Sequence, residues 1–396
     1  MPTTQQTTIA LAEAASATAR RWTTEVDSQN RFPHEAVGEL RDAGLLALMA
    51  PAELGGGEGS YELLAQVASI LGEGCLSTAI VWAMHSQQVL TLADHGRPNN
   101  DDVLASVVRD GSLIASVTSE SGTGGQLLAV QAPLRIDAGR LHLVRAAPIV
   151  SYAAEARYFL VTVRASAEAS PHDVRLVVVS RDDGNIQVTG RWDAMGMRGT
   201  QSVPLSLDVH IDQARMLDET FRAVATRTFV PAGHVGWTAA WHGAARGALS
   251  RYVRWLRRRN SEGAVRLDSD LVLSRLADMR ARLDAVGALV RQVALRMDRL
   301  RTERAPSARF EGPTQQIELN NLKIVGSEIT FRVVDDLVQL AGLDEGYRAS
   351  GATGLEQVFR DLRSASLMYG NERLRQANGR LLFIEDGPSS TLWSPS

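Results

Sequence analysis

The feature that most constrains the fold of this chain is a change in hydrophobic period along it. Apolar residues recur at helical spacing up to about Val108, in short β-branched or alternating runs from about Ser112 to Leu217, and at helical spacing again from about Glu219. A sequence with helical spacing of its apolar residues does not suit a strand, so each region should form a domain of its own. The sequence therefore predicts an α-then-β-then-α protein with three domains, at residues 1–111, 112–218 and 219–396.

Each region also predicts its own elements. In the first, Pro33 opens a helix that Gly44 ends, and residues 61–72 and 75–94 form two more helices. In the second, five runs separated by Gly, Asp and Ser suit the strands of an antiparallel barrel or sandwich. In the third we expect four long helices. The predicted strands cover residues 113–117, 141–144, 158–163, 174–179 and 203–209.

Composition excludes several classes of function. The formal net charge of -3 gives no electrostatic reason to expect nucleic acid. Cys75 is the only cysteine, which rules out a disulfide within the chain and a zinc site built from several thiolates, and we predict no metal site. The sequence shows no signal peptide and no apolar run long enough to span a membrane. We therefore expect a cytoplasmic protein.

Several short segments carry a resemblance to one family. Residues 117–125 read Val-Thr-Ser-Glu-Ser-Gly-Thr-Gly-Gly, residues 149–152 read Ile-Val-Ser-Tyr, and residues 195–202 read Met-Gly-Met-Arg-Gly-Thr-Gln-Ser. These segments resemble, in the same order, the flavin-binding segments of acyl-CoA dehydrogenases. The similarity covers nearly the whole chain. It implies the α+β fold of that family: an N-terminal helical domain, a middle β-barrel or sandwich domain and a C-terminal four-helix bundle.

The resemblance also implies a flavin, expected to be non-covalent FAD. The hydroxyl of Ser119 would face the flavin pyrimidine, and glycines in the same loop would let backbone amides approach the pyrophosphate. Ile149 takes the place of the aromatic residue that covers the flavin, and Ser151 keeps a hydroxyl at its N5 edge. The glycines concerned are Gly122, Gly124 and Gly125.

Three further residues are expected to reach a flavin held by a neighbouring subunit. Gln339 and Gly342 lie in a segment similar to the family's Gln-x-x-Gly-Gly strip, with Ala341 in place of the first glycine. Arg259 falls where the family places a pyrophosphate-binding arginine, although a solvated basic helix face would explain it equally well. These positions imply a homotetramer or a homodimer.

The usual catalytic base of the family is replaced in this sequence. Residues 359–372 resemble the family's C-terminal signature, yet Tyr369 stands at the offset of the glutamate that removes the substrate α-proton. A phenol with a pKa of about 10 is a poor base, so we expect Tyr369 to contribute its backbone amide. His85 is the preferred substitute, because an imidazole titrates near pH 6.5. A hydrogen-bonded core histidine is the competing interpretation, and the remaining candidates are His234, His242 and Glu372.

Three functions follow from this pattern. The first is an FAD-dependent oxidoreductase that dehydrogenates an acyl thioester of coenzyme A or a carrier protein, uses an atypical base and passes electrons to an acceptor flavoprotein. The second is a flavin monooxygenase of the same fold, which uses reduced flavin and O2, acts on another small molecule and depends on a flavin reductase. The third is a catalytically silent paralogue that serves as a binding subunit. In the first two, His85 and Ser151 are the residues expected nearest the chemistry.

Overall fold

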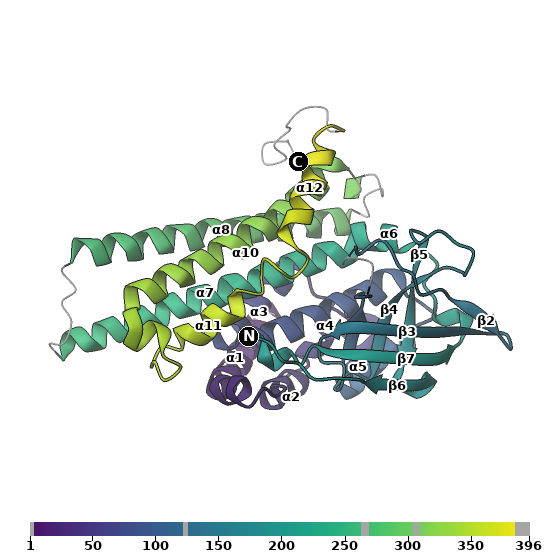
Figure 1. Ribbon diagram of the computed structural model, residues 1–396, viewed down its shortest axis with the longest axis horizontal. Coiled ribbons are helices and arrows are strands. Elements are labelled where there is room, and N and C mark those ends of the chain that lie inside the picture. Colours follow the sequence, from purple (N-terminus) through teal and green to yellow (C-terminus); the bar gives the residue numbers. More distant parts are fainter. Residues whose placement is uncertain (1–3, 122–125, 263–268, 304–308, 311, 385–396) are drawn as a thin grey trace.

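The computed structural model describes residues 4–121, 126–262, 269–303, 309–310 and 312–384. Helices form one part of the molecule and strands the other (Figure 1). The change from helices to strands falls between Asp110 and Ile114, and the return to helices falls between Ile211 and Phe221. The order of elements is therefore the one that the change in hydrophobic period predicts.

The N-terminal part contains five α-helices. The third begins where Ser60 accepts a hydrogen bond from the Leu63 amide at 3.0 Å, which satisfies one of the free donors of the first turn. The fourth is apolar on nearly all sides because it packs on α3, on β1 and on the C-terminal helix α7. The five helices are α1 (Thr4–Ser28), α2 (His34–Asp42), α3 (Tyr61–Gly74), α4 (Leu76–His95) and α5 (Asp101–Asp110).

The strands form two sheets. One has the order β1-β4-β5 and the other the order β2-β3-β7-β6. The expectation of a wholly antiparallel domain is wrong at one pair: β1 runs parallel to β4, with Ile114 opposite Tyr158, because the chain crosses to the other sheet between them. The strands are β1 (Ile114–Val117), β2 (Arg135–Asp137), β3 (Arg140–Val150), β4 (Tyr158–Arg164), β5 (Val174–Ser180), β6 (Gly184–Val188) and β7 (Val203–Ile211).

The C-terminal part contains three long helices among the described residues, and the expectation of four long helices is wrong. A fourth long helix does not form because Gly354 and Gly370, which are poor helix formers, bound two short helices near the end of the chain. A π-helical segment, η6 (Ala225–Phe229), leads into the first long helix. The helices are α6 (Phe221–Val224), α7 (Val230–Ser261), α8 (Asp270–Thr302), α10 (Pro313–Gly342), α11 (Leu355–Leu362) and α12 (Asn371–Leu381), with a second π-helical segment at η7 (Leu343–Tyr347).

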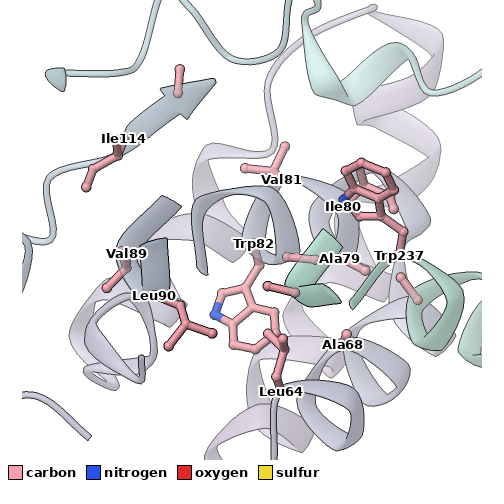
Figure 2. Packing of buried hydrophobic residues seen from close by; sticks show 14 of the residues in the cluster. Leu64, Ala68, Ala79, Ile80, Val81, Trp82, Val89, Leu90, Ile114 and Trp237 are labelled. Atoms are coloured by element: carbon pink, nitrogen blue, oxygen red, sulfur yellow. The ribbon is translucent and has the colours of Figure 1, made fainter. Parts of the chain in front are cut away.

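The core is centred where α3, α4 and α7 meet. Figure 2 shows Trp82 of α4 among the apolar side chains of this core and Trp237 of α7 beside Ile80. Gly243 permits the close approach of α3 to α7, because a Cβ atom on it would lie only 1.9 Å from the carbonyl oxygen of Ser69. The tight contact holds α7 in place across the middle of the molecule. No helix in the described part of the chain combines the length and apolar character needed to cross a membrane.

Candidate functional site

A pocket of about 510 Å³ lies where the two sheets meet the helices. Most of its wall is apolar and is made by methionine, isoleucine and aromatic side chains, while hydroxyl groups form one edge. The lining residues are Ile80, Met84, Gln87, Ser116, Thr118, Ile149, Ser151, Trp192, Ala194, Met195, Gly196, Met197, Thr200, Ser202, Phe229, Trp237, Arg360, Arg363, Ser364, Leu367, Met368 and Tyr369.

The described lining of this pocket contains no aspartate, glutamate or histidine. Its charged residues are two arginines. Arg360 is neutralised by Asp27, at 2.6 Å, and by Glu356. Arg363 donates to the hydroxyl of Ser366 at 3.1 Å and has no ion pair with a described carboxylate. Among the lining residues that the structure describes, no group that commonly acts as a base at neutral pH therefore faces the pocket.

Ser151 ends a chain of hydroxyl groups at the polar edge. Its Oγ lies 2.9 Å from Ser202 Oγ, which lies 2.8 Å from Thr200 Oγ1. Thr200 donates its proton to the carbonyl of Met197 at 2.8 Å, since a carbonyl only accepts. Ser202 must then donate to Thr200, and Ser151 to Ser202. The proton of Ser151 is thus used inside the wall, and its free lone pair can accept a hydrogen bond from a ligand in the pocket.

Ser119 and Ile149 contact each other beside the pocket. The hydroxyl of Ser119 donates to the carbonyl of Ile149 at 2.7 Å and accepts from the Ile149 amide at 3.3 Å. Buried Arg145 donates to the carbonyl of Ser119 at 3.0 Å and braces the loop after β1. Ile149 lines the pocket, with 53% of its surface exposed. Ser119 therefore supports Ile149 in this structure, and its own proton is occupied.

The predicted pyrophosphate glycines, Gly122, Gly124 and Gly125, lie outside the described residues.

Tyr369 forms part of the pocket wall and has an unusual environment. Its backbone is left-handed, with φ of 55°. Its ring packs on Trp237 and His234, with centroids 6.0 and 5.9 Å apart. The phenolic oxygen is buried and has no hydrogen-bond partner in the described structure. Burial raises the pKa of Tyr369 well above its ordinary value, so the phenol is neutral at pH 7 and is unsuited to act as a base.

His85 does not line the pocket. It is completely buried, with Nε2 2.9 Å from the carbonyl of Leu46 and Nδ1 accepting from the Ile114 amide at 3.1 Å. Burial lowers the pKa of His85 to about 4. Both nitrogens of a neutral ring are used, so His85 connects α4 to β1 and to the segment after α2. This geometry favours the core interpretation of His85 over a role as base.

The other base candidates also point away from the pocket. Glu372 is exposed and pairs with Arg375 at 2.6 Å. His242 lines a separate groove and lies 3.4 Å from the hydroxyl of Ser69. His234 lies behind Tyr369, with Nδ1 3.1 Å from the carbonyl of Leu319, and burial lowers its pKa to about 3.

Two of the sequence motifs contact each other at one side of the pocket. The carboxylate of Asp361 accepts a hydrogen bond from the amide of Met197. Arg360 donates to the carbonyl of Met195 at 2.9 Å. Gly196 lies so close that a Cβ atom on it would be 2.2 Å from the carbonyl oxygen of Arg360. The segment after β6 is therefore fixed on α11, and this contact closes one side of the pocket.

Arg259, Gln339 and Gly342 are not brought to this pocket. They lie at the ends of α7 and α10 that are farthest from the strands (Figure 1). Arg259 stacks over the Trp255 ring, with 5.9 Å between its guanidinium carbon and the ring centroid. Gln339 donates to Asp335 at 3.1 Å. Within one chain they cannot join the pocket, and their predicted contact with a neighbouring subunit's flavin stays a prediction.

The residues around the pocket fit a flavin ring. Apolar side chains such as Ile149 and Trp192 would cover its faces, and the hydroxyls of Ser151 and Thr118, which also line the pocket, could bond to its polar edge. The free lone pair of Ser151 is a ready acceptor for a ring N–H group. Among the described residues no cluster of three or more His, Cys, Asp or Glu could hold a metal ion.

Sequence reasoning missed four residues that shape this site: Thr200, Ser202, Trp237 and Lys323. The signal for Thr200 and Ser202 was present, because both stand in the quoted segment 195–202. Trp237 and Lys323 lie in long helices where periodicity marks only which face is buried.

Comparison with known proteins gives one family. The model described as "Acyl-CoA dehydrogenase, N-terminal domain" matches residues 3–103, and "Acyl-CoA dehydrogenase, C-terminal domain" matches residues 223–378. Among curated proteins, the amino sugar nitrososynthase DnmZ of Streptomyces peucetius is 25% identical over 87% of this chain and 84% of its own. The probable acyl-CoA dehydrogenase YngJ of Bacillus subtilis (strain 168) is 22% identical over 89% of this chain and 90% of its own.

Solved structures share the whole fold. Butyryl-CoA dehydrogenase from Megasphaera elsdenii superimposes with a TM-score of 0.84 at 20% identity, covering 97% of this chain and 99% of the other. FMN-bound TdsC from Paenibacillus sp. A11-2 superimposes with a TM-score of 0.85 at 19% identity, covering 98% of this chain and 100% of the other. At these identities the likeness establishes the arrangement of helices and strands and leaves the reaction open.

Proposed function

The chain belongs to the acyl-CoA dehydrogenase family, and from this premise we propose that it is a flavin-dependent monooxygenase that uses reduced flavin and O2 to oxidise a largely apolar small molecule. One oxygen atom of O2 would enter the substrate and the other would leave as water, with two electrons supplied by the reduced flavin. A separate flavin reductase would provide that reduced flavin.

The observation that carries the proposal is the lack of a base in the described pocket lining. Dehydrogenation of an acyl thioester requires a group that takes the α-proton. The side chain that stands at the expected position is the neutral phenol of Tyr369, and its raised pKa makes proton abstraction at pH 7 unfavourable. His85, the preferred substitute in the sequence analysis, has both ring nitrogens occupied in the core. A monooxygenase does not need that base.

The hydroxyl chain gives a second reason. Reduced flavin carries a hydrogen on N5, whereas the same nitrogen of oxidised flavin is an acceptor. Because the proton of Ser151 is donated to Ser202, the site offers an acceptor and favours the reduced form. The resemblance to the family implies that Ser151 lies at this edge of the ring, which supports the same assignment. The side chains would therefore select the redox state with which a monooxygenase begins.

Each part of the site then has a role. Ile149 and Trp192 would cover the flavin ring, and Ser151 would accept from its edge. The apolar wall, including Met84 and Trp237, would bind the substrate and exclude water from the reacting oxygen. The phenol of Tyr369, unpaired in the described structure, would donate a hydrogen bond to a substrate or flavin oxygen. The side chain of Tyr369 would have to change its rotamer to expose the buried hydroxyl, because rotation of the ring about its own axis leaves the oxygen in place.

Relatives of both kinds support the choice of chemistry without deciding it. Nitrososynthases and acyl-CoA dehydrogenases match the chain at similar identity. One related structure holds FMN and indole. We retain FAD and an oligomer with shared flavin sites as predictions, since Arg259 and Gln339 could serve only a neighbouring subunit. FMN would need neither residue.

Anaerobic mixing with acyl thioesters tests the proposal. Flavin-loaded protein would be mixed with butyryl-CoA and octanoyl-CoA while the flavin absorbance is followed. We expect no bleaching, because no base in the described lining can take the α-proton. A parallel reaction with reduced FMN, ¹⁸O₂ and a panel of apolar aromatic amines, sulfides and indoles should yield a product with one labelled oxygen. Bleaching by either thioester would support the dehydrogenase instead, and no reaction in either arm would support the silent paralogue.

A further inference from the structure

Lys323 is the only lysine in the chain and is completely buried. It lies in the middle of α10, beneath the segment that carries Tyr369 into α12. A buried lysine is rarely tolerated without a specific partner, because burial removes the water that solvates its ammonium group. The position and the isolation of this residue therefore call for a specific role.

The contacts of Lys323 are polar but lack a carboxylate. Its Nζ donates to Asn371 Oδ1 at 2.6 Å and to the carbonyl of Tyr369 at 3.4 Å. It also lies 5.8 Å from the centroid of the Trp241 ring, within the range of a cation–π interaction. Within the described residues it forms no ion pair. The ammonium group thus binds two acceptors, the carbonyl of Tyr369 and the side-chain oxygen of Asn371, on either side of Gly370.

Those two contacts fix the conformation of Tyr369. A left-handed backbone is unfavourable for a residue with a side chain, by roughly 1 kcal/mol or more, and persists only where its surroundings hold it. Lys323 holds the carbonyl of Tyr369 itself and the side chain two residues later. Glu328 accepts from the other end of the Asn371 amide at 2.9 Å. The segment cannot turn at Tyr369 without breaking these contacts.

We propose that Lys323 is a positioning residue of the candidate active site, whose ammonium group holds Tyr369 in the left-handed conformation and so keeps the tyrosine ring in the pocket wall. This inference rests on the proposed function only in taking the pocket as the active site. Deprotonation would leave Lys323 with weaker donors, and the Tyr369 segment would relax. The shape of the pocket would then depend on pH.

The groups around Lys323 set the pH range. Burial lowers the pKa of Lys323 to about 7; Glu328 raises it and Arg375 lowers it. His234, which faces it from α7, stays neutral above about pH 3 and adds no charge. The phenol of Tyr369 also stays neutral through this range. The ammonium form is therefore complete below pH 7 and is lost as the pH rises through 7.

Because Lys323 is the only lysine, its titration can be read without assignment. Flavin-loaded protein would carry lysine labelled at Cε and Nζ and 3-fluorotyrosine, with the Tyr369 fluorine signal identified by its loss in Tyr369→Phe. Both signals would be followed by NMR between pH 5.5 and 9.5. We expect one lysine signal that titrates near 7 and a Tyr369 signal that shifts with the same midpoint.

Three variants separate positioning from mere packing. Lys323→Met should abolish the pH dependence of the Tyr369 signal and leave it at its high-pH position. Lys323→Gln introduces a neutral donor, so the Tyr369 signal should stay at its low-pH position at every pH. This variant also serves if the methionine variant does not fold. Thr330→Val, a buried change on the same helix whose hydroxyl bonds only to Gly326, should lower stability and keep the wild-type titration. A lysine that titrates near 10.5, or a Tyr369 signal that ignores the lysine midpoint, would overturn the inference. Neither NMR signal depends on turnover. A protein that fails in the oxygenation assay could therefore still confirm or overturn the role of Lys323.

Discussion

At the residue scale, the direction of the Ser151 hydrogen bond is set by Thr200 and Met197, with which Ser151 forms no hydrogen bond itself. Its proton is committed because Ser202 must donate to Thr200, and Thr200 to the carbonyl of Met197. The same serine without that chain would be free to donate to a ligand. A local sequence pattern shows that a hydroxyl is present, but the direction of its hydrogen bond follows only from the contacts beyond it.

Ser202→Ala should lower the reduction potential of the bound flavin by about 30 mV. The change frees the Ser151 proton, which can then be donated to the acceptor nitrogen of oxidised flavin. One neutral hydrogen bond of this kind would raise the affinity for oxidised flavin relative to reduced flavin by up to tenfold. A spectroelectrochemical titration measures it. Ser112→Ala is the matched control, because Ser112 pairs with the hydroxyl of Ser106 at 2.8 Å away from the pocket. An unchanged or raised potential in Ser202→Ala would rule out the inferred direction.

His85→Ala should lower the free energy of unfolding by about 2–4 kcal/mol, because it leaves the Leu46 carbonyl and the Ile114 amide unpaired in the core. The absorbance spectrum of bound flavin should not change. Chemical denaturation and flavin titration check the two parts. A hundredfold loss of turnover at unchanged stability would instead restore His85 to the catalytic role that the sequence analysis gave it.

Of the residues that the sequence analysis placed nearest the chemistry, Ser151 and Tyr369 line the pocket, whereas His85 lies outside its described lining. His85 stands in an apolar helix, and periodicity could not show whether its ring turns toward the pocket or toward β1. The direction of the ring depends on the position of the Leu46 carbonyl, which is set by the tertiary structure. Lys323 was missed, because nothing in the pattern of α10 distinguishes a buried cation from an exposed one.

At the element scale, the central feature is the contact between segment 192–202 and α11. The sequence showed both motifs but not that they touch, since 164 residues separate Met197 from Asp361. The strand predictions were accurate where β-branched runs are long, as in β4 and β5, and failed for the short, exposed β2 and β6, which lack an apolar run. The parallel pairing of β1 with β4 has no local signal either.

Gly196→Ala should disrupt this contact. A Cβ atom would lie 2.2 Å from the carbonyl oxygen of Arg360, so backbone must move and the hydrogen bond from Met197 to Asp361 should break. We expect a loss of at least about 2 kcal/mol in unfolding free energy and weaker flavin binding. Gly379→Ala is the control, since nothing lies within 4 Å of its added Cβ and a helical alanine is favourable. Equal stability of both variants would argue against this contact.

At the scale of the whole molecule, four histidines with lowered pKa values should make the fold sensitive to acid. Burial lowers the pKa of His85, His95 and His242 to about 4 and of His234 to about 3. The unfolded chain takes up protons below about pH 6.5, whereas the folded protein does not. The stability they contribute is therefore complete above pH 6.5 and is lost as the pH falls toward 4, by up to about 3 kcal/mol for each histidine.

Asp361 and Asp298 oppose this trend, because burial raises the pKa of Asp361 to about 7 and the pKa of Asp298 above its ordinary value, and both shifts favour the folded state in acid. Four histidines outweigh two aspartates, so the net expectation is a fall in stability. Urea denaturation at pH 7.0, 5.5 and 4.5 measures it. A constant free energy of unfolding over this range would show that these imidazoles are not held neutral in the fold.

At the same scale, the reaction of the bound reduced flavin with O2 distinguishes the monooxygenase from the dehydrogenase most directly. The protein would be loaded with FMN, reduced without air and mixed rapidly with O2 while the flavin absorbance is recorded. The monooxygenase account predicts two resolved kinetic phases, because the apolar pocket should delay the return of the flavin to its oxidised form after the reaction with O2. Reoxidation in a single phase, at the rate of free reduced FMN and with full release of hydrogen peroxide, would contradict it.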